Sequence, residues 1–339
     1  MSVTPATAAS DSAAADISRA TIEAAATRIA PFIIETPLIE SPRLNDKLGI
    51  RLLVKAECLQ HTGSFKLRGA SNAVWSLDDT VKHVVAFSSG NHAQGVARAA
   101  ASRGLQATIV MPKDSPAGKI EGTKAYGGTV ILYDRYTESR EEIGADLATR
   151  KQAHLSKPFD DVRVIAGQGT VGLEIATQAA AKNLTPDAII CCCGGGGLIA
   201  GMSIAASDMI PGVDIWAAEP EFYDDTRRSL ASGKIETADI TMPSICDSII
   251  TAQPGEITFP INKKLLSGSA VITDRDALQA VATAFKHLKI IIEPGGAAAL
   301  AAVLTRQYPA GAKTVVAVAS GGNIDAPMFQ RALDEGPLF

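Results

Sequence analysis

The sequence predicts an α/β fold of two domains, with parallel-type sheets flanked by helices. Six short apolar runs rich in Val, Ile and Ala are continuous rather than alternating, which is typical of strands buried on both faces. Most of these runs end in Gly, Ser or Pro and are followed by a helical pattern. This alternation indicates helices on both faces of a parallel sheet.

The predicted elements alternate along the chain. The strand-forming runs, with the residues that close them, are "HVVAFSSGN" (83–91), "ATIVMP" (107–112), "TVILYD" (129–134), "DAIICCCGGGG" (187–197), "VDIWAAEP" (213–220) and "KTVVAVASGGN" (313–323). Helices are expected at 92–103, 170–183, 198–209, 274–289 and 296–307. Because ligands of such sheets bind beyond the carboxyl ends of the strands, functional residues are expected where these runs end.

The composition describes a globular protein without a basic face. Of the 339 residues, 46% are apolar and 20% charged, and the formal net charge is −4. Nucleic acid is therefore not an expected partner, and no apolar run approaches the length of about 20 residues that crosses a bilayer. The five cysteines lack Cys-x-x-Cys spacing, which favours a reducing cytoplasm over disulfides or a zinc site.

The chain is expected to contain a small domain inserted into a large one. Residues 1–15 are rich in Ala, Ser and Thr and have no positive charge, so they are predicted to form a flexible leader, not a targeting peptide. The predicted large domain consists of 16–80 and 157–339, and the predicted small domain is 81–156. No repeat and no linker rich in Pro or Gly marks the boundary.

The loop "CCCGGGGLIAG" (191–201) is the strongest local signal. Successive glycines let backbone N–H groups point at an anion, and the positive end of the following helix supports it, so we expect a phosphate here. Gly195, Gly197 and Ala200 also fit a loose dinucleotide fingerprint, with Glu219 as its ribose acid. On this loop alone, an NAD-dependent oxidoreductase therefore stays an alternative.

Lys66 in "HTGSFKLRGA" (61–70) is the candidate reactive amine. One phosphate in a glycine loop together with a lysine elsewhere suggests pyridoxal phosphate, which forms a Schiff base with a lysine. Phe65 is expected to pack against the cofactor ring. Taken alone, the stretch favours a solvated turn.

Three further segments favour a cofactor site. "SSGNHAQG" (88–95) closes a strand and opens a helix, so its N–H groups and hydroxyls can hold a carboxylate. "SGGN" (320–323) closes the last strand and "IIEPGGAAAL" (291–300) opens a helix. The expected cofactor contacts of these segments are Asn91, Ser320 and Glu293, and the expected substrate contacts are Ser88, Ser89, Gly90, Asn91 and His92. His92 also fits a histidine that only terminates a helix.

Seven motifs together resemble a known family, the fold-type II pyridoxal-phosphate enzymes, which share a tryptophan synthase beta-like fold. The motifs are "TGSFKLRGA", "SSGNHAQG", "AGQGTVGLE", "GGGGLIAG", "AAEP", "EPGGAAALAA" and "SGGN". The resemblance runs from about Ile17 to Arg331 and is strongest to threonine/serine dehydratases and serine racemases. It implies a homodimer, with Lys66 as the Schiff-base lysine, Asn91 at the ring hydroxyl, Ser320 at the ring nitrogen, and a phosphate cup of Gly194, Gly195, Gly196, Gly197 and Leu198.

The resemblance also suggests residues on the substrate side. In the racemase branch a serine at the position of Ser89 is the second acid/base; here it could instead only bind the carboxylate. Arg140 in "ESREE" (138–142) matches an arginine that reaches toward the substrate in related enzymes and could grip a carboxylate. The alternative for Arg140 is a solvated helix face. Thr251 is a further candidate for a substrate contact.

A cation site is implied by "EPEFYDD" (219–225). Carboxylates of Glu219 and Asp225 and the carbonyl of Tyr223 would supply hard oxygen ligands for Mg²⁺ or Ca²⁺. An acidic loop without metal is the alternative. The segment "SICDSIITAQPGEITFP" (244–260) departs from the family pattern, because Ser248 stands where a glycine is usual. Substrate identity is therefore the least determined feature.

We expect a cytoplasmic lyase that uses pyridoxal phosphate to dehydrate a small β-hydroxy amino acid to a 2-oxo acid and ammonia. L-Threonine and L-serine are the first expected substrates. The alternatives are a 3-hydroxyaspartate dehydratase, a serine racemase and, in a different class, a catalytically silent protein that binds pyridoxal phosphate and an amino acid. A serine at the ring nitrogen suits β-elimination, because it cannot keep that nitrogen protonated as a carboxylate would.

Overall fold

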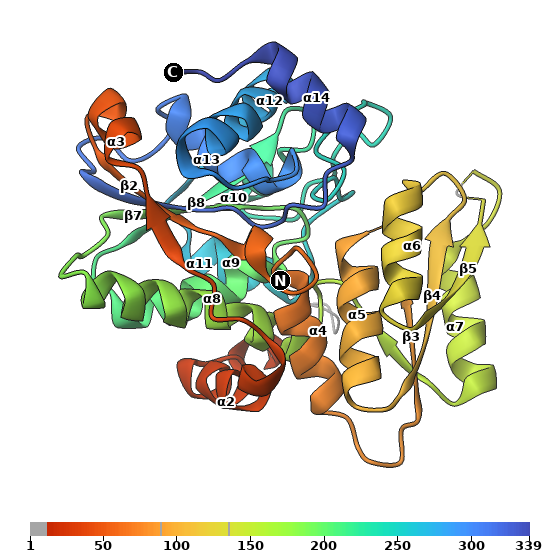
Figure 1. Ribbon diagram of the computed structural model, residues 1–339. Coiled ribbons are helices and arrows are strands. Elements are labelled where there is room, and N and C mark those ends of the chain that lie inside the picture. Colours follow the sequence, from red (N-terminus) through yellow and green to blue (C-terminus); the bar gives the residue numbers. More distant parts are fainter. Residues whose placement is uncertain (1–11, 89, 135) are drawn as a thin grey trace.

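The computed structural model describes residues 12–88, 90–134 and 136–339, which form two sheets with helices on both faces (Figure 1). The larger sheet has six strands in the order β1-β2-β10-β7-β8-β9, and the smaller has four in the order β5-β4-β3-β6. All neighbouring strands are parallel except β1 and β2. The predicted α/β class is thus confirmed.

The strands differ in how well the sequence predicted them. Each of the six predicted runs overlaps a strand. These strands are β3 (His83–Phe87), β4 (Gln106–Pro112), β5 (Gly128–Tyr133), β7 (Ala188–Cys192), β8 (Asp214–Pro220) and β10 (Thr314–Val318). The prediction missed β1 (Leu38–Glu40), β2 (Arg51–Lys55), β6 (His154–Ser156) and β9 (Gly268–Ile272). Three of these four lie at sheet edges, where one side of the strand stays unpaired and the apolar run is shorter.

The helices cover both sheets. They are α2 (Arg19–Ile29), α3 (Pro42–Leu48), α4 (Lys66–Trp75), α5 (Asn91–Ser102), α6 (Ala117–Ala125), α7 (Arg140–Lys151), α8 (Val162–Ala181), α9 (Gly197–Met209), α10 (Asp225–Ser232), α11 (Thr258–Leu265), α12 (Asp274–Thr283), α13 (Ala298–Leu304) and α14 (Ala326–Glu335). Short helical turns occupy Ala30–Phe32, Glu57–Leu59 and Gly295–Ala297, and a π-helical turn, Ala284–Leu288, continues α12. The helix predicted at 274–289 is therefore divided into two kinds of turn.

Helix α8 begins eight residues before its predicted start at residue 170. Asp161 caps it by accepting a hydrogen bond from the N–H of Arg163 at 2.8 Å. The glycines of "AGQGTVG" (166–172) lie inside this helix. A Cβ on Gly172 would lie 2.4 Å from the carbonyl oxygen of Met202 in α9. These glycines therefore allow two helices to pack closely.

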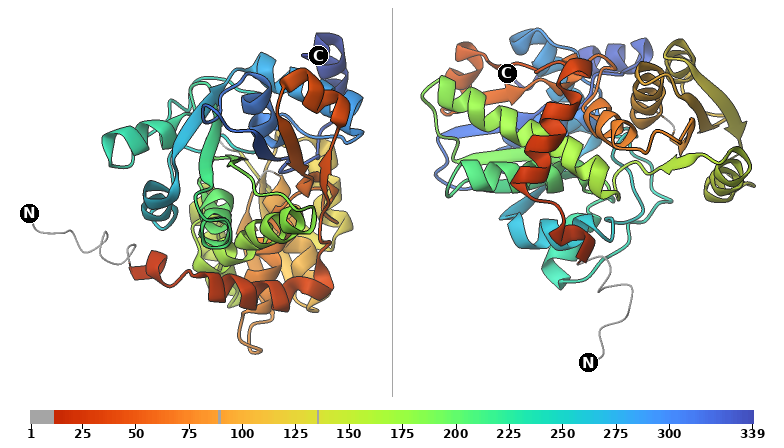
Figure 2. Two further views of the ribbon diagram at one scale, coloured as in Figure 1. Left: turned by 90° about the vertical axis from the view of Figure 1, so that its left-hand side faces the viewer. Right: turned by 90° about the horizontal axis from the view of Figure 1, so that it is seen from below.

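The two sheets divide the chain between them. Strands of the small sheet come from 83–156, and strands of the large sheet come from 38–55 and 188–318. Helix α2 packs on α8 and α9 at one side of the large sheet (Figure 2). The predicted flexible leader lies mostly outside the described residues, and residues 12–15 form a helical turn. Among the described helices, none is long and apolar enough to span a membrane.

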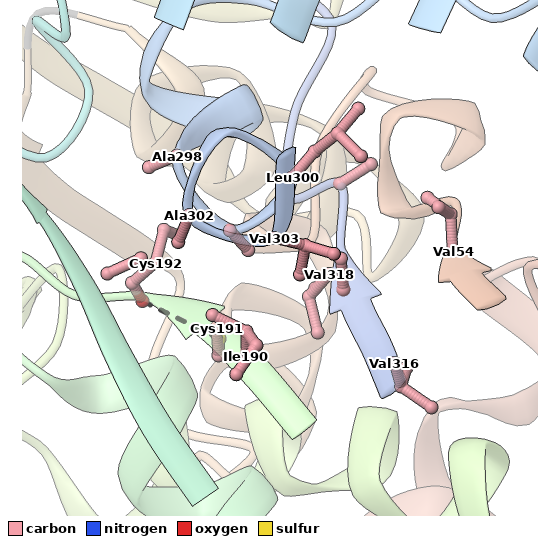
Figure 3. Close-up of a cluster of buried hydrophobic side chains, with 14 of the residues drawn as sticks. Val54, Ile190, Cys191, Cys192, Ala298, Leu300, Ala302, Val303, Val316 and Val318 are labelled. Carbon is pink, nitrogen blue, oxygen red and sulfur yellow. Dashed lines mark hydrogen bonds between the residues drawn. The ribbon is translucent and has the colours of Figure 1, made fainter. Parts of the chain in front are cut away.

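The largest apolar core lies around the large sheet. Side chains of β2, β7 and β10 pack there with α13, and Val316 and Leu300 are fully buried (Figure 3). Smaller clusters cover the two faces of the small sheet. Because β7 and β10 are buried neighbours, the loops at their carboxyl ends are held at one fixed place beside the start of α4.

Candidate active site

Lys66 is the first residue of α4 and lies beside the end of β10. The N–H of Phe65 donates to the carbonyl of Ser320 at 3.0 Å, and Ser64 forms a bridge with Gly321. The lysine borders a cavity of about 650 Å³. Predicted residues that line this cavity are Ser88, Gly90, Asn91, His92, Arg140, Tyr223 and Thr251. The fold thus brings together segments that are far apart in the sequence.

The amine of the Lys66 side chain is shielded from solvent. Its Nζ donates to the carbonyl of Pro158 at 3.0 Å, and burial lowers the pKa of Lys66 to about 8. Because an amine with this pKa is partly neutral near pH 8, it can act as a base. Lys66 is therefore suited to accept a proton from a molecule in the cavity.

The four glycines 194–197 connect β7 to α9 in a conformation that has no room for side chains. Gly196 has a φ of +86°, a region that favours glycine. A Cβ on Gly195 would lie 2.4 Å from the Phe159 ring, and one on Gly194 would lie 2.8 Å from the carbonyl oxygen of Ile249. The loop leads into α9 with Leu198 in its first turn. Its bare backbone and the helix N-terminus fit a phosphate.

Ser320 follows β10 and is 3% exposed. Its N–H donates to the carbonyl of Gly296 at 3.2 Å, and its Oγ accepts a hydrogen bond from Cys192 Sγ at 3.2 Å. The hydroxyl thus lies at the adjoining ends of β7 and β10, near the start of α4. The residue that the resemblance assigns to the ring nitrogen is thus a neutral hydroxyl and not a carboxylate.

Asn91 at the start of α5 is part of a polar network. Its Nδ2 donates to Glu293 Oε1, and its Oδ1 accepts from Asn323 Nδ2 at 2.7 Å. Burial raises the pKa of Glu293 to about 7, although the nearby Lys119 opposes the shift. Lys119 of α6 also pairs with Asp247 at 2.6 Å. This network joins the small sheet's helices to loops of the large sheet.

Sequence reasoning missed Lys119 and Asn323 as members of this network. Lys119 lies in "AGKIEGTK", a stretch of small and charged residues for which no element was predicted, yet its side chain is only 10% exposed. Nothing in the local sequence indicates this burial, because the carboxylates that surround Lys119 come from residues 247 and 293. Asn323 belongs to the predicted "SGGN" segment, so the motif that contains it was available as a signal.

His92 and Ser88 lie at the cavity wall. Burial and the adjacent Lys66 lower the pKa of His92 to about 3, so the imidazole is neutral at pH 7. Its Nε2 lies 3.4 Å from Ser156 Oγ. Ser88 Oγ accepts the N–H of Gly90 at 3.2 Å. The predicted acid/base Ser89 lies outside the described residues.

Arg140 and Thr251 border the outer part of the same cavity. Arg140 begins α7, pairs with Glu141 at 2.8 Å and has a side chain that is 50% exposed. Its guanidinium lies 5.4 Å from the centre of the Phe87 ring. The hydroxyl of Thr251 is buried and has no hydrogen-bond partner within the described part of the chain. Both side chains are placed where they can contact a ligand in the cavity.

The predicted cation ligands gather at the end of β8. Glu219 accepts the N–H groups of Thr226 at 2.8 Å and Arg227 at 2.9 Å. Burial and the neighbouring Asp225 raise the pKa of Glu219 to about 8, and burial raises the pKa of Asp225 to about 7. Asp225 Oδ2 is buried without a partner among the described residues. Two buried carboxylates with an unpaired oxygen fit a hard cation.

Comparisons with known proteins agree on one family. A model described as "Pyridoxal-phosphate dependent enzyme" matches residues 29–321. The chain belongs to the pyridoxal-phosphate-dependent enzyme family. Serine racemase of Oryza sativa subsp. indica is 39% identical over 315 residues, 90% of either chain. L-threo-3-hydroxyaspartate ammonia-lyase of Saccharomyces cerevisiae is 37% identical over 314 residues, 91% of this chain and 95% of the relative.

Solved structures of this pyridoxal-phosphate family share the fold. The threonine deaminase of T.th. has a TM-score of 0.86 and 42% identity, covering 91% of this chain and 99% of that one. Maize serine racemase has a TM-score of 0.87 and 37% identity, covering 94% and 97%. The predicted family resemblance is thereby confirmed. The family match favours pyridoxal phosphate over the dinucleotide considered for the glycine loop.

The residues present fit the family's cofactor. The bare glycine loop suits its phosphate, Lys66 supplies the amine, and Phe65 lies beside that amine, with the Lys66 Nζ 5.1 Å from the ring centre. Ser320, beside the start of α4, and Asn91, in the cavity wall, supply polar groups. These cofactor and substrate roles remain predictions about the individual residues, which the fold places around one cavity.

A buried ionic cluster lies next to the first turn of α4, which begins at Lys66, and the sequence did not predict it. Arg68 is fully buried and pairs with Glu57 at 2.7 Å and Glu174 at 2.5 Å. Lys55 completes the cluster through Glu174, also at 2.5 Å. Arg68 follows Lys66 by two residues, so these pairs fix the first turn of α4 against β2 and α8.

Proposed function

We propose that this member of the pyridoxal-phosphate family is an ammonia-lyase that dehydrates a small β-hydroxy amino acid, with L-threonine and L-serine as the first substrates. The products are a 2-oxo acid and ammonia. The observation that carries the proposal is the amine of Lys66, with its pKa lowered to about 8, at the wall of a cavity also lined by the start of α5.

The residues divide the work between binding and proton transfer. Backbone N–H groups at the start of α5 and the Ser88 hydroxyl hold the substrate carboxylate. When bound, the cofactor supplies an electron sink that acidifies the substrate's Cα–H bond. Lys66 Nζ accepts that proton, and the hydroxyl on Cβ departs with the bond electrons. Ser320 in place of a carboxylate favours this elimination over reactions that need a protonated ring nitrogen.

The first test is spectroscopic and kinetic. The purified protein should show a visible absorption band that borohydride removes, and it should release 2-oxo acid from L-threonine or L-serine. A protein that retains the band but releases no 2-oxo acid from any β-hydroxy amino acid would instead be the catalytically silent alternative. A colourless protein that binds NAD would contradict the cofactor assignment.

Arg140 favours a second candidate, a 3-hydroxyaspartate dehydratase. Its guanidinium lines the cavity that Lys66 borders, and a planar fork binds a second carboxylate well. Arg140→Ala should then lower kcat/KM on 3-hydroxyaspartate diastereomers roughly 100-fold, since a charged hydrogen bond contributes about 1.5–3 kcal/mol. Turnover of L-threonine should change little.

The matched control is Arg150→Ala in the same helix. Arg150 pairs with Asp146, and both side chains are exposed. It should leave both activities unchanged. If Arg140→Ala lowered kcat/KM equally on L-threonine and 3-hydroxyaspartate, that would contradict binding of a second carboxylate by Arg140. Formation of D-serine from L-serine would support the third candidate, serine racemase, with Ser89 as the second acid/base.

We also propose Mg²⁺ or Ca²⁺ at Glu219, Asp225 and the Tyr223 carbonyl, and a cytoplasmic homodimer. The buried carboxylates support the cation, although the described residues contain no group of three or more His, Cys, Asp or Glu that could hold a metal. Five buried free cysteines support a reducing compartment. The dimer is implied by the family resemblance, and light scattering tests it.

A further inference from the structure

Cys192 is the last residue of β7, Ser320 follows the end of the neighbouring β10, and their side chains meet. The Sγ of Cys192 lies 3.2 Å from the Oγ of Ser320, with the thiol as donor. The two residues are 4% and 3% exposed. Because both side chains are buried, little water competes for either group, and the hydrogen bond between thiol and hydroxyl is persistent.

The backbone of Ser320 is fixed, and only its hydroxyl is left to be oriented. Its N–H donates to Gly296 and its carbonyl accepts from Phe65. A serine hydroxyl has one proton and two lone pairs. When the thiol donates to one lone pair, the serine proton stays free for another acceptor. When the serine instead donates to sulfur, only a lone pair faces that acceptor.

We infer that Cys192 is a positioning residue whose S–H donates to Ser320 Oγ and thereby directs the Ser320 proton toward the ring nitrogen of the cofactor. This inference rests on the cofactor role of Ser320 in the proposed function. A hydrogen bond donated to an unprotonated ring nitrogen moderates the electron sink, which is the condition that favours elimination.

Cys191 offers a matched control on the same strand. Successive side chains of a strand point to opposite faces, and Cys191 is fully buried as well. Its Sγ donates to the Cys192 carbonyl at 3.5 Å, not to Ser320. Both thiols lie in the apolar cluster around β7 and α13 (Figure 3). Removing either sulfur should therefore cost similar packing.

The first experiment compares Cys192→Ala with Cys191→Ala as holoproteins. Cys192→Ala should weaken pyridoxal phosphate binding roughly 3- to 10-fold, the worth of one net hydrogen bond, and change the pH dependence of the visible band. Cys191→Ala should stay within about twofold of wild type. Cys192→Ser, which can donate from the same place, should recover most of the loss. Equal behaviour of the two alanine variants would overturn the inference.

The second experiment compares the wild-type protein with Ser320→Ala and uses no Cys192 variant. Infrared spectroscopy of the S–H stretch should show one band of the wild-type protein moving to higher frequency in Ser320→Ala, because the thiol loses its acceptor. An unchanged set of S–H bands would refute the hydrogen bond. Neither the binding result nor the infrared result depends on turnover. A protein that is inactive on every hydroxy amino acid would therefore contradict the proposed function but not the role inferred for Cys192.

Discussion

At the scale of single residues, the proposed reaction depends on ionisable side chains that are buried away from water. Lys66 and His92 have lowered pKa values and Glu293 a raised one, and in each case burial is the first cause. The sequence predicted these three residues as site members. It could not predict their ionisation, because burial is set by segments far away in the chain.

The lowered pKa of Lys66 gives a pH prediction. A base must be neutral to accept a proton, so turnover should fall as pH drops below about 8, the pKa of this amine, and level off above it. Steady-state rates of 2-oxo acid release between about pH 6 and 10 check this. Lys66→Ala should lower kcat by roughly three orders of magnitude or more. Normal turnover in that variant would exclude Lys66 as the base.

At the scale of elements, glycines inside helices have opposite roles in α8 and α6. Gly172 in α8 faces the backbone of α9, and an added Cβ would lie 2.4 Å from the Met202 carbonyl oxygen. At Gly118 in α6, an added Cβ would meet no atom of another described segment within 4 Å. The sequence shows both as helix-disfavouring residues, and only packing separates them.

The two glycines therefore predict stability changes of opposite sign. Gly172→Ala should destabilise the protein by about 1–3 kcal/mol through overpacking. Gly118→Ala should stabilise it by about 0.5–1 kcal/mol, since alanine is the better helix former. Urea unfolding of both variants measures the difference. A stabilised Gly172→Ala would mean that α8 and α9 are not in close contact.

The ionic cluster at the start of α4 gives a second prediction at this scale. Arg68→Met leaves Glu57 buried and Glu174 partly buried without their arginine partner, although Lys55 still pairs with Glu174. This should cost about 3–5 kcal/mol. The exposed pair of Arg150 should contribute at most about 0.5 kcal/mol, so Arg150→Ala is the reference. Chemical denaturation of the two variants tests this, and equal losses would argue against a buried cluster.

At the scale of the whole molecule, the site is assembled between the two sheets. Lys119 comes from a helix beside the small sheet, while Asp247 and Glu293 come from loops of the large-sheet part. The cavity wall likewise takes residues from both parts of the chain. The relative position of the two sheets should therefore affect how Asn91 and Glu293 are held.

The candidate cation site predicts how the stability of the whole fold depends on pH. The pKa values of Glu219 and Asp225 are raised to about 8 and about 7. Carboxyls with raised folded-state pKa values give stability that is fully present below their unfolded values, near about 4, and is lost as pH rises through about 7–8. In chelator, the melting temperature should fall between about pH 5 and 8.

Added Mg²⁺ or Ca²⁺ should remove most of that fall, because a bound cation favours the ionised carboxylates. Asp225→Asn should also flatten the pH profile in chelator and abolish the cation effect. Identical melting curves with chelator and with cation at about pH 8 would argue against the site. The measurement needs no substrate and is independent of the reaction proposed.

Local sequence patterns predicted six of the ten described strands and marked the segments that follow them as places where ligands bind. The apolar runs and the glycine loop could be recognised because local pattern and turn composition encode strands, loops and anion-binding backbone. The roles of Lys66 and Ser320 came from the family resemblance and stay predictions. The folded chain was needed to reveal that Cys192 meets Ser320, that Lys119 meets Asp247, and that the glycines of α8 face α9. The first two of these contacts each join residues 128 positions apart, and the third joins two separate helices, so no local pattern records them.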